Sequence, residues 1–274
     1  MDSLISIQHT PSETYTSGFD SPYYQIMLFD GVGSFEVDFT RYNFKSHTIL
    51  FLSPYQHLKW STDCDIDIYQ LQFHGDFYCI EYHKKEVACN GLLFNNIYLH
   101  PHLPLSYPSF EEITAIFDKL KLEVKDTHIY ADSVLRAYLQ LILALCSKEK
   151  KTILASQAHP INVPTDMDQF QQLLEQNFIQ QRSVAHYADQ LALSTDAFSK
   201  KIKKQFGKTP SQLIQDRVVL EAKKRLHLTF KSIKQIASEL HFEDEFYFSR
   251  YFKKCVGLSP AHYREQVGIS VVAK

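Results

Sequence analysis

The chain has 274 residues, 45% of them hydrophobic and 22% charged, so it can bury real cores and is not a disordered chain. Its longest apolar stretches, such as residues 139–146, fall far short of the roughly 18 residues of a membrane span, so we expect neither a membrane partner nor a secretory signal. The five cysteines are scattered and form no C-x-x-C pair, which predicts a protein of the reducing cytoplasm without disulfides or structural zinc.

The formal net charge of −2 hides an asymmetry along the chain. Residues 1–165 hold 12 basic and 19 acidic residues (net −7), whereas the remainder holds 17 basic and 12 acidic residues (net +5). Such a contrast indicates a nucleic-acid-binding part joined to a different one. Two globular domains with unequal surfaces would explain it about equally well, so the charge alone does not decide.

The first part of the chain predicts a domain over residues 1–151. Residues 1–20 are polar and predict a loosely held arm. Residues 21–105 carry short β-branched and aromatic runs, at 24–29, 34–39, 48–52 and 66–73, separated by Gly, Pro or Asp. This spacing is typical of a β-sandwich or barrel, and its many aromatic residues suit either a filled barrel or one that encloses a small ligand. Individual effector-binding residues cannot be assigned.

Apolar residues at helical spacing predict a pair of helices over residues 109–150. The second helix is apolar over more than half its circumference, so it must be buried within its own domain or against a second copy of the chain. Both alternatives stay open. If the chain forms a homodimer, we expect Leu135, Leu139 and Ile142 in the interface. Residues 152–165 contain two prolines and no periodicity, and they are the predicted linker.

Residues 166–267 predict an all-helical domain with an internal repeat. A helix capped by Ser183, a short turn and a second helix ending at Gly207 are followed, about 50 residues later, by the same pattern from Ser232 to Gly257. Thr209-Pro210 and Ser259-Pro260 each open the helix that comes next. The matching apolar positions are Val184, Tyr187, Ala188, Leu191, Phe198, Ile202 and Phe206 in the first copy and Ile233, Ile236, Ala237, Leu240, Phe248, Phe252 and Val256 in the second.

Two short helices joined by a tight turn are typical of a helix-turn-helix, whose second helix enters the major groove of DNA. The alternative is an ordinary helical bundle. Basic residues on the outer faces of both second helices favour DNA, because phosphate neutralisation requires them. A helix over about residues 210–228 would span roughly 27 Å at about 1.5 Å per residue. We expect it to hold two reading helices about one DNA turn (about 34 Å) apart on the same side of the duplex.

The repeat resembles the signature of AraC/XylS-type transcription regulators. The resemblance is carried by Ser232-Ile233-Lys234-Gln235-Ile236-Ala237, Phe242, Tyr247–Lys254 and Gly257–Arg264. It implies two helix-turn-helix units in one chain, a specific site on double-stranded DNA, and regulation of transcription, most often activation with RNA polymerase as a partner. The N-terminal half also resembles the family's cupin-like effector and dimerisation domain, through its strand order and Ser53-Pro54…His57.

The expected fold class is therefore α+β. A cupin-like β-barrel or sandwich with a helical hairpin would precede an all-α domain with two helix-turn-helix motifs joined by a long helix. The resemblance implies an unidentified small-molecule effector bound by the first domain. It also implies DNA-reading residues on the two second helices. These are Thr195, Asp196, Ser199, Lys200, Lys203 and Lys204 on the first and Glu245, Phe246, Ser249, Arg250 and Lys253 on the second.

The chemistry of three of these positions leaves alternatives. Arg250 can make a bidentate contact to guanine or pair with a nearby carboxylate, and Phe246 can pack on a thymine methyl or be a partly covered surface aromatic. Glu245 either accepts a hydrogen bond from a cytosine amino group or weakens binding by the second unit. His241 stands where the family usually has Gly; a left-handed backbone there would cost on the order of 1 kcal/mol.

The rival class of protein is a metal-dependent cupin enzyme. His47, His57, His74 and His83 are scattered, and the His100-Pro101-His102 triplet lies in a proline-rich segment, so we expect no metal, no cofactor and no catalysis. A third class, a DNA-binding protein that responds to no ligand, also stays open.

Overall fold

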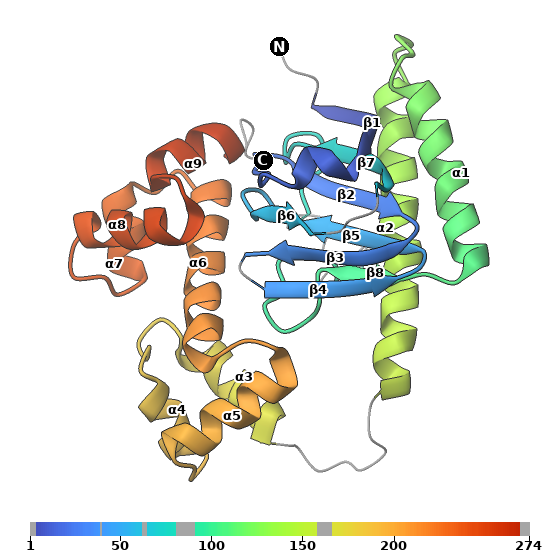
Figure 1. Cartoon of the computed structure of the whole chain (residues 1–274). Coiled ribbons are helices and arrows are strands. Elements are labelled where there is room, and N and C mark those ends of the chain that lie inside the picture. Colours follow the sequence, from blue (N-terminus) through green and yellow to red (C-terminus); the bar gives the residue numbers. More distant parts are fainter. Residues whose placement is uncertain (1–3, 39, 62–64, 81–90, 158–165, 269–274) are drawn as a thin grey trace. The chain divides into compact units, whose positions relative to one another are not determined.

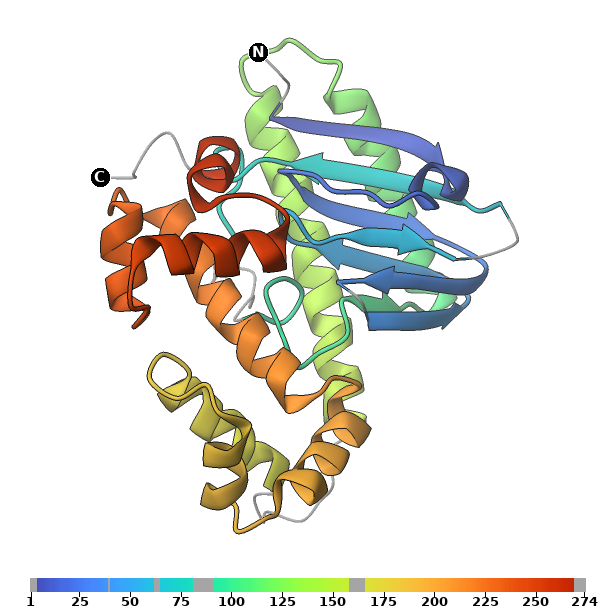
Figure 2. The same ribbon diagram turned by 60° about the vertical axis from the view of Figure 1, so that its left-hand side comes forward.

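The computed structural model describes residues 4–38, 40–61, 65–80, 91–157 and 166–268 (Figures 1 and 2). The chain divides into two compact units. The first unit comprises Met1–Asn96 and His100–Ala158, and the second comprises Ile97–Leu99 and His159–Lys274. None of the helices in the described ranges has the length and apolarity to cross a membrane.

The first unit contains two antiparallel sheets. A five-stranded sheet has the order β1-β7-β2-β5-β8 and a three-stranded sheet has the order β4-β3-β6. The strands are β1 (Ile5–Pro11), β2 (Tyr24–Phe29), β3 (Val32–Val37), β4 (Thr40–Lys45), β5 (Thr48–Leu52), β6 (Leu58–Trp60), β7 (Asp67–Phe73) and β8 (His102–Pro104).

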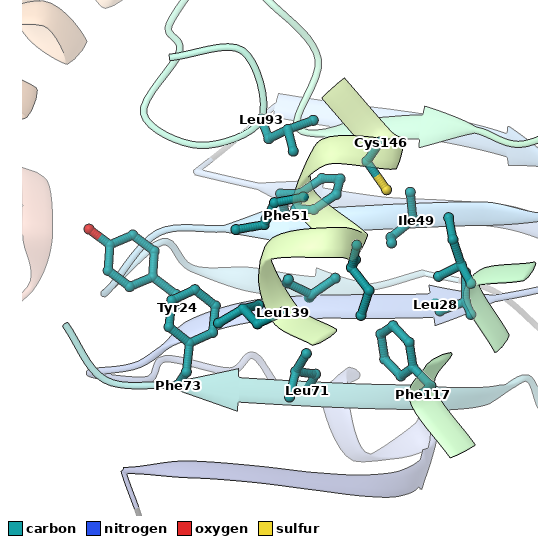
Figure 3. Packing of buried hydrophobic residues seen from close by; sticks show 14 of the residues in the cluster. Tyr24, Leu28, Ile49, Phe51, Leu71, Phe73, Leu93, Phe117, Leu139 and Cys146 are labelled. Atoms are coloured by element: carbon teal, nitrogen blue, oxygen red, sulfur yellow. The ribbon is translucent and has the colours of Figure 1, made fainter. Parts of the chain in front are cut away.

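Strands β2 and β5 lie at the centre of three layers. Every residue of both strands is buried, because each face of the sheet is covered. One face packs on α1 (Tyr107–Glu123) and α2 (Ala131–Gln157), as Leu28 and Ile49 do against Phe117 and Leu139 (Figure 3). The other face packs on the three-stranded sheet. Burial on both faces explains why these strands form continuous apolar runs in the sequence.

The apolar stripe of α2 is buried within its own unit. Leu135, Leu139 and Ile142 are 4%, 0% and 0% exposed and belong to the core between α1, α2 and the five-stranded sheet. These side chains are therefore not available at the surface for a second copy of the chain, and the stripe is explained by the sheet it covers. Homodimerisation stays a prediction without an assigned surface.

The prediction of a loosely held arm is wrong for residues 5–15. Strand β1 pairs with β7 along its whole length, with Ile5 opposite Phe73, and a short 3-10 helix, Ser12–Tyr15, follows it. The Tyr15 ring is 1% exposed, and burial raises its pKa to about 12. The sequence hid this strand because β1 is at the edge of the sheet and exposes polar side chains such as Gln8 and His9.

Two further boundaries differ from the sequence expectation. Helix α2 continues through Gln157, so residues 152–157 are helical and not linker. This stretch contains neither Pro nor Gly, and Ile153 packs against the core. The rest of the predicted linker lies outside the described residues. His102 begins strand β8 and does not lie in a loop.

The second unit is built on one long helix, α6, with α3–α5 at one end and α7–α9 at the other (Figure 1). The α+β class predicted for the chain is confirmed. The helices are α3 (Asp166–Asn177), α4 (Val184–Gln190), α5 (Thr195–Phe206), α6 (Pro210–Leu228), α7 (Ile233–Glu239), α8 (Glu245–Val256) and α9 (Pro260–Val267).

Candidate nucleic-acid interface

The second unit contains two helix pairs, α4–α5 and α7–α8, with the same internal construction. In each pair both helices bury side chains that match across the sequence repeat, and α5 and α8 both pack on α6. The repeat is therefore a structural repeat. The fully buried matching residues are Tyr187, Ala188, Phe198 and Ile202 in the first pair and Ile236, Ala237, Phe248 and Phe252 in the second.

A left-handed residue makes the turn in each pair. Ala192 and His241, at equivalent positions, both have φ of 52°. The next residue returns its N–H to the preceding helix, Leu193 to the Ala188 carbonyl and Phe242 to the Ala237 carbonyl, both at 2.9 Å. This is the Schellman arrangement, which usually places glycine at the left-handed position. The left-handed backbone that the sequence allowed for His241 is confirmed, and the first pair has the same feature.

The ends of α5 and α8 are fixed by local signals. Ser194 and Asp244 are the N-caps; the Asp244 carboxylate accepts the Tyr247 N–H at 2.6 Å. Of the three consecutive carboxylates Glu243, Asp244 and Glu245 at the start of α8, Asp244 therefore stabilises the helix itself. Gly207 and Gly257 end the two helices at φ of 70° and 85°, and a Cβ at either position would meet nothing within 4 Å. Glycine is needed there for its backbone conformation and not for space.

Helix α5 presents most of its predicted DNA-reading residues to solvent, but two of them engage each other. Thr195, Asp196, Lys200, Lys203 and Lys204 are exposed, and Ser199 is half-buried. The Lys200 ammonium lies 2.9 Å from the Asp196 carboxylate, one turn away, and both side chains are more than three-quarters exposed. The charge of Lys200 is thus offset in the free protein.

Helix α8 presents a different set at the equivalent positions. Phe246 is 70% exposed, Arg250 and Lys253 are exposed, and Glu245 and Ser249 are half-buried. Arg250 has no ion-pair partner among the residues that the structure describes. The structure therefore does not contain the alternative in which Arg250 pairs with a nearby carboxylate. Phe246 stands where the first pair has Asp196, and Arg250 stands where it has Lys200.

Tyr247 and Lys254 are exposed on the same helix as Phe246 and were not among the predicted DNA-reading residues. Tyr247 is 46% exposed, and its ring lies 5.8 Å from that of Phe242 in the preceding turn. The exposed aromatic pair Phe246-Tyr247, unusual on a solvated helix, was the available sequence signal.

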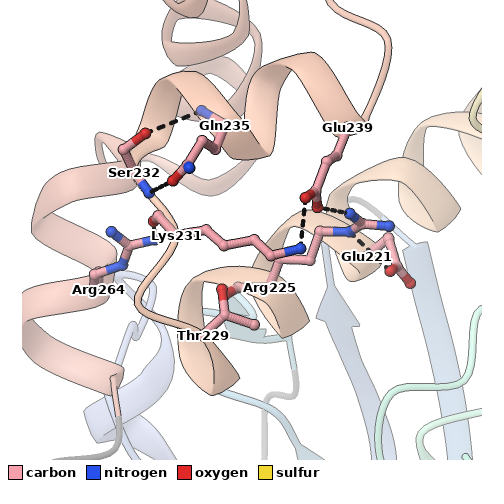
Figure 4. Close-up of polar contacts among 8 residues, drawn as sticks. All are labelled: Glu221, Arg225, Thr229, Lys231, Ser232, Gln235, Glu239 and Arg264. Carbon is pink, nitrogen blue, oxygen red and sulfur yellow. Dashed lines mark hydrogen bonds and ion pairs between the residues drawn. The ribbon is translucent and has the colours of Figure 1, made fainter.

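The C-terminal end of α6 is joined to the second helix pair by charged contacts (Figure 4). The Arg225 guanidinium pairs with Glu221, one turn away, and with Glu239 at the end of α7; Lys231 also pairs with Glu239. The Lys231 hydrogen bond and the neighbouring cations lower the pKa of Glu239, so its carboxylate stays charged. From α9, Arg264 donates to the Lys231 carbonyl at 2.6 Å. These bonds fix α7 and α9 relative to α6.

The N-terminal half of α6 is joined to α3 in a comparable way. Arg217 on α6 donates to Glu175 at 2.8 Å, and its guanidinium stacks 3.8 Å from the centre of the Phe178 ring. Capping boxes are present at the starts of α6 and α7; in each, a Gln side chain accepts a hydrogen bond from the N-cap backbone N–H. The long helix and its two helix pairs therefore form one connected body.

Residues 187–266 match the family model described as a helix-turn-helix domain. The arabinose operon regulatory protein of Escherichia coli (strain K12) is 33% identical over 92 residues, which cover 34% of this chain and 30% of that protein. The transcriptional activator RhaS of Pectobacterium atrosepticum is 30% identical over 93 residues, covering 34% of this chain and 33% of RhaS. The chain thus spans about a third of the length of these relatives.

The solved structures that match include the following two. The C-terminal domain of the response regulator yesN from Fusobacterium nucleatum is 28% identical, with a TM-score of 0.34, over 36% of this chain and 96% of that one. ToxT from Vibrio cholerae is 16% identical, with a TM-score of 0.42, over 99% and 97% of the chains. The family model defines the class of this region: residues 187–266 are a helix-turn-helix domain. The same region is similar in sequence to parts of the arabinose operon regulatory protein and of RhaS.

Proposed function

We propose that the chain is a sequence-specific DNA-binding regulator of transcription in which α4–α5 and α7–α8 both act as helix-turn-helix units. The observation that carries this proposal is the repeated frame, which presents basic side chains at matching positions of α5 and α8. Lys203 and Lys204 on α5 and Lys253 and Lys254 on α8 occupy the same places in the repeat and are exposed. Exposed cations on a helix that can enter a groove are suited to bind phosphates.

Binding of the full chain to a pool of random duplexes at low salt tests the proposal. We expect one family of sequences to be enriched, and Lys203→Glu with Lys253→Glu to weaken binding to it. The matched control is Lys119→Glu with Lys125→Glu, the same charge change at exposed positions in and just after α1 of the first unit. Failure to retain any duplex, or an equal loss in the control, would contradict the proposal.

We further propose that the regulator is an activator that works with RNA polymerase. The relative RhaS is named as an activator, and the arabinose and raffinose relatives are named as operon regulators. A reporter gene placed behind a selected DNA site tests this. Transcription that rises with the protein supports activation, and transcription that falls indicates repression instead.

The first unit is proposed to bind the small-molecule effector beside a cluster of four rings. Phe35, Tyr42 and His102 lie with ring centres 5.4–5.8 Å apart, and His100 stacks on His102 at 5.4 Å. Burial, with nearby His100 and Lys150, lowers the pKa of His102 to about 4, so its ring is neutral at pH 7. The buried Nδ1 of His102 has no hydrogen-bond partner among the described residues. The same is true of Nε1 of Trp60, whose ring also packs on Phe35.

Polar atoms buried without a partner are costly and suit a ligand that supplies one. The test is thermal stabilisation of the full chain by a panel of metabolites, compared with Tyr42→Ala. We expect a compound that stabilises the natural chain, stabilises this variant less and changes DNA binding. DNA binding that no metabolite alters would favour a regulator that responds to no ligand.

A further inference from the structure

Arg182 connects the two ends of the DNA-binding unit directly. It lies in the loop between α3 and α4, and its guanidinium Nη2 donates to the carbonyl of Leu240, the last residue before the turn of the second helix pair. The same nitrogen donates to the Ile179 carbonyl at 3.5 Å, within its own loop. The guanidinium also stacks 4.0 Å from the centre of the Phe242 ring, which lies in the turn itself. One side chain thus joins segments 58 residues apart.

The contact is favourable for the Nη2 donor and for the face of the guanidinium, whereas the buried Nε of Arg182 has no hydrogen-bond partner among the described residues. The last carbonyls of a helix have no partner inside the helix and carry its negative dipole end, so a cation that donates there is stabilised. A guanidinium over an aromatic face adds cation–π attraction. Burial lowers the pKa of Arg182, but a guanidinium remains charged in proteins. Arg182 therefore caps α7 and covers the turn that sets the direction of α8.

This contact adds a second connection between the helix pairs. The first connection is α6, on which α5 of the first pair and α8 of the second both pack. A single helix can bend or twist along its length, so it fixes the direction of two attached bodies only loosely. A direct bond from the loop before α4 to the turn before α8 closes a ring of contacts, and a closed ring resists that twist.

We propose that Arg182 fixes the spacing of the two DNA stretches that the helix pairs recognise. The proposal rests on the proposed function, because it assumes that both pairs enter the duplex. One base pair changes the distance along DNA by about 3.4 Å and rotates the groove by roughly a tenth of a turn. Selection for one spacing therefore needs the helix pairs held to within a fraction of those values, which a closed ring achieves better than one helix.

Arg217 is a matched control for Arg182. It too is an arginine with a guanidinium stacked on a phenylalanine, at 3.8 Å, and it too bonds to a partner far along the chain. Its partners, Glu175, Phe178 and Glu221, lie on or next to α3 and α6 and not in α7–α9. Replacing Arg217 should perturb the fold of the unit to a similar degree without opening the ring through the second helix pair.

The experiment uses the full chain and a duplex selected from a random pool, with derivatives that have one base pair inserted or removed between the two recognised stretches. We expect the natural chain to lose about tenfold or more in affinity on either derivative. Arg182→Ala should bind the selected duplex more weakly, and its penalty for altered spacing should fall to about threefold or less. Arg217→Ala should keep the full penalty. Thermal unfolding followed by circular dichroism verifies that each variant is folded.

If Arg182→Ala does not fold, Arg182→Gln serves in its place, since it keeps a donor for the Leu240 carbonyl and lacks the charge and the flat stacking group. A folded Arg182 variant with the same spacing penalty as the natural chain would overturn the inference and leave the proposed function intact. Equal relaxation by Arg217→Ala would overturn it as well. A natural chain that selects no duplex at all would instead contradict the proposed function.

Discussion

The two helix pairs of the C-terminal unit have the same frame and different outer faces. Buried positions, left-handed turn residues and glycine C-caps coincide between α4–α5 and α7–α8. At the first exposed turn, however, α5 carries Asp196 and Lys200, paired at 2.9 Å, whereas α8 carries Phe246 and Arg250, which is unpaired among the described residues. Packing determines the shared backbone arrangement of the two pairs. The exposed side chains that would contact DNA are not constrained by packing and can differ between the pairs.

This difference predicts a division of work between the pairs. The exposed lysines of α5 suit sequence-independent contact with phosphates. Phe246 and Arg250 suit base edges, because an aromatic ring can pack on a thymine methyl and a guanidinium can grip guanine with two hydrogen bonds. Glu243 and Glu245, which precede or begin α8, oppose phosphate and leave its first turn to base contacts.

The largest expected effect tests the shared frame. Phe198→Ala and Phe248→Ala each remove a fully buried ring at matching positions, and each should lower the free energy of unfolding by about 3–5 kcal/mol. Helix unfolding followed by circular dichroism in denaturant measures the loss. Trp60 fluorescence gives a separate signal from the first unit, because Trp60 is the only tryptophan in the chain. A cost below about 1 kcal/mol in either variant would mean that the two frames are not equivalent.

The next effect tests the different outer faces. Arg250→Ala should weaken binding to a selected duplex by about 1–3 kcal/mol, roughly 5- to 150-fold, if its guanidinium contacts guanine. Lys200→Ala should cost less than about 1 kcal/mol, because the lysine already has Asp196 as a partner. Fluorescence anisotropy at one salt concentration compares them. The division of work fails if Lys200→Ala costs as much as Arg250→Ala.

The turn residues give a stabilising prediction. Ala192→Gly and His241→Gly should each raise the free energy of unfolding by about 0.5–1 kcal/mol. Glycine adopts a φ of 52° without the steric cost of a Cβ, and this gain is partly offset by the conformational entropy that glycine adds to the unfolded chain. Thermal unfolding of the two variants and of the double variant measures the gain. Destabilisation of either variant would show that its side chain contributes a contact that outweighs the backbone cost.

The smallest effect concerns salt. Lys203→Ala and Lys253→Ala should each reduce the slope of log affinity against log salt by about 1 and leave base preference unchanged. Titrations at several salt concentrations measure the slope. An unchanged slope for Lys253→Ala alone would sharpen the comparison, since it would mean that only the first pair contacts the phosphate backbone.

Features that depend on neighbouring residues were predictable from the sequence. The bounds of α6, the Thr209 and Ser232 capping boxes and the glycine C-caps all arise from interactions within about five residues. The Asp196–Lys200 pair also had a local signal, its spacing of one helical turn.

Features that depend on distant partners could not be found in this way. From the sequence alone, the apolar stripe of α2 fits a dimer interface and a helix that covers a sheet equally well. Only the three-dimensional structure shows that the stripe packs on the five-stranded sheet. Strand β1 looked like a polar arm because its pairing partner, β7, begins more than fifty residues later. Arg182 gave no signal, since the carbonyl it binds belongs to Leu240.

The most direct test of the account is hydroxyl-radical protection of a selected duplex by the full chain. Two helix pairs that read one face of DNA predict two protected stretches whose centres lie about one helical turn, roughly 10 base pairs, apart. Removing α8's contacts with Arg250→Ala should weaken protection of one stretch more than the other. A single protected stretch that responds equally to changes on α5 and α8, or no protection at low salt, would contradict the account.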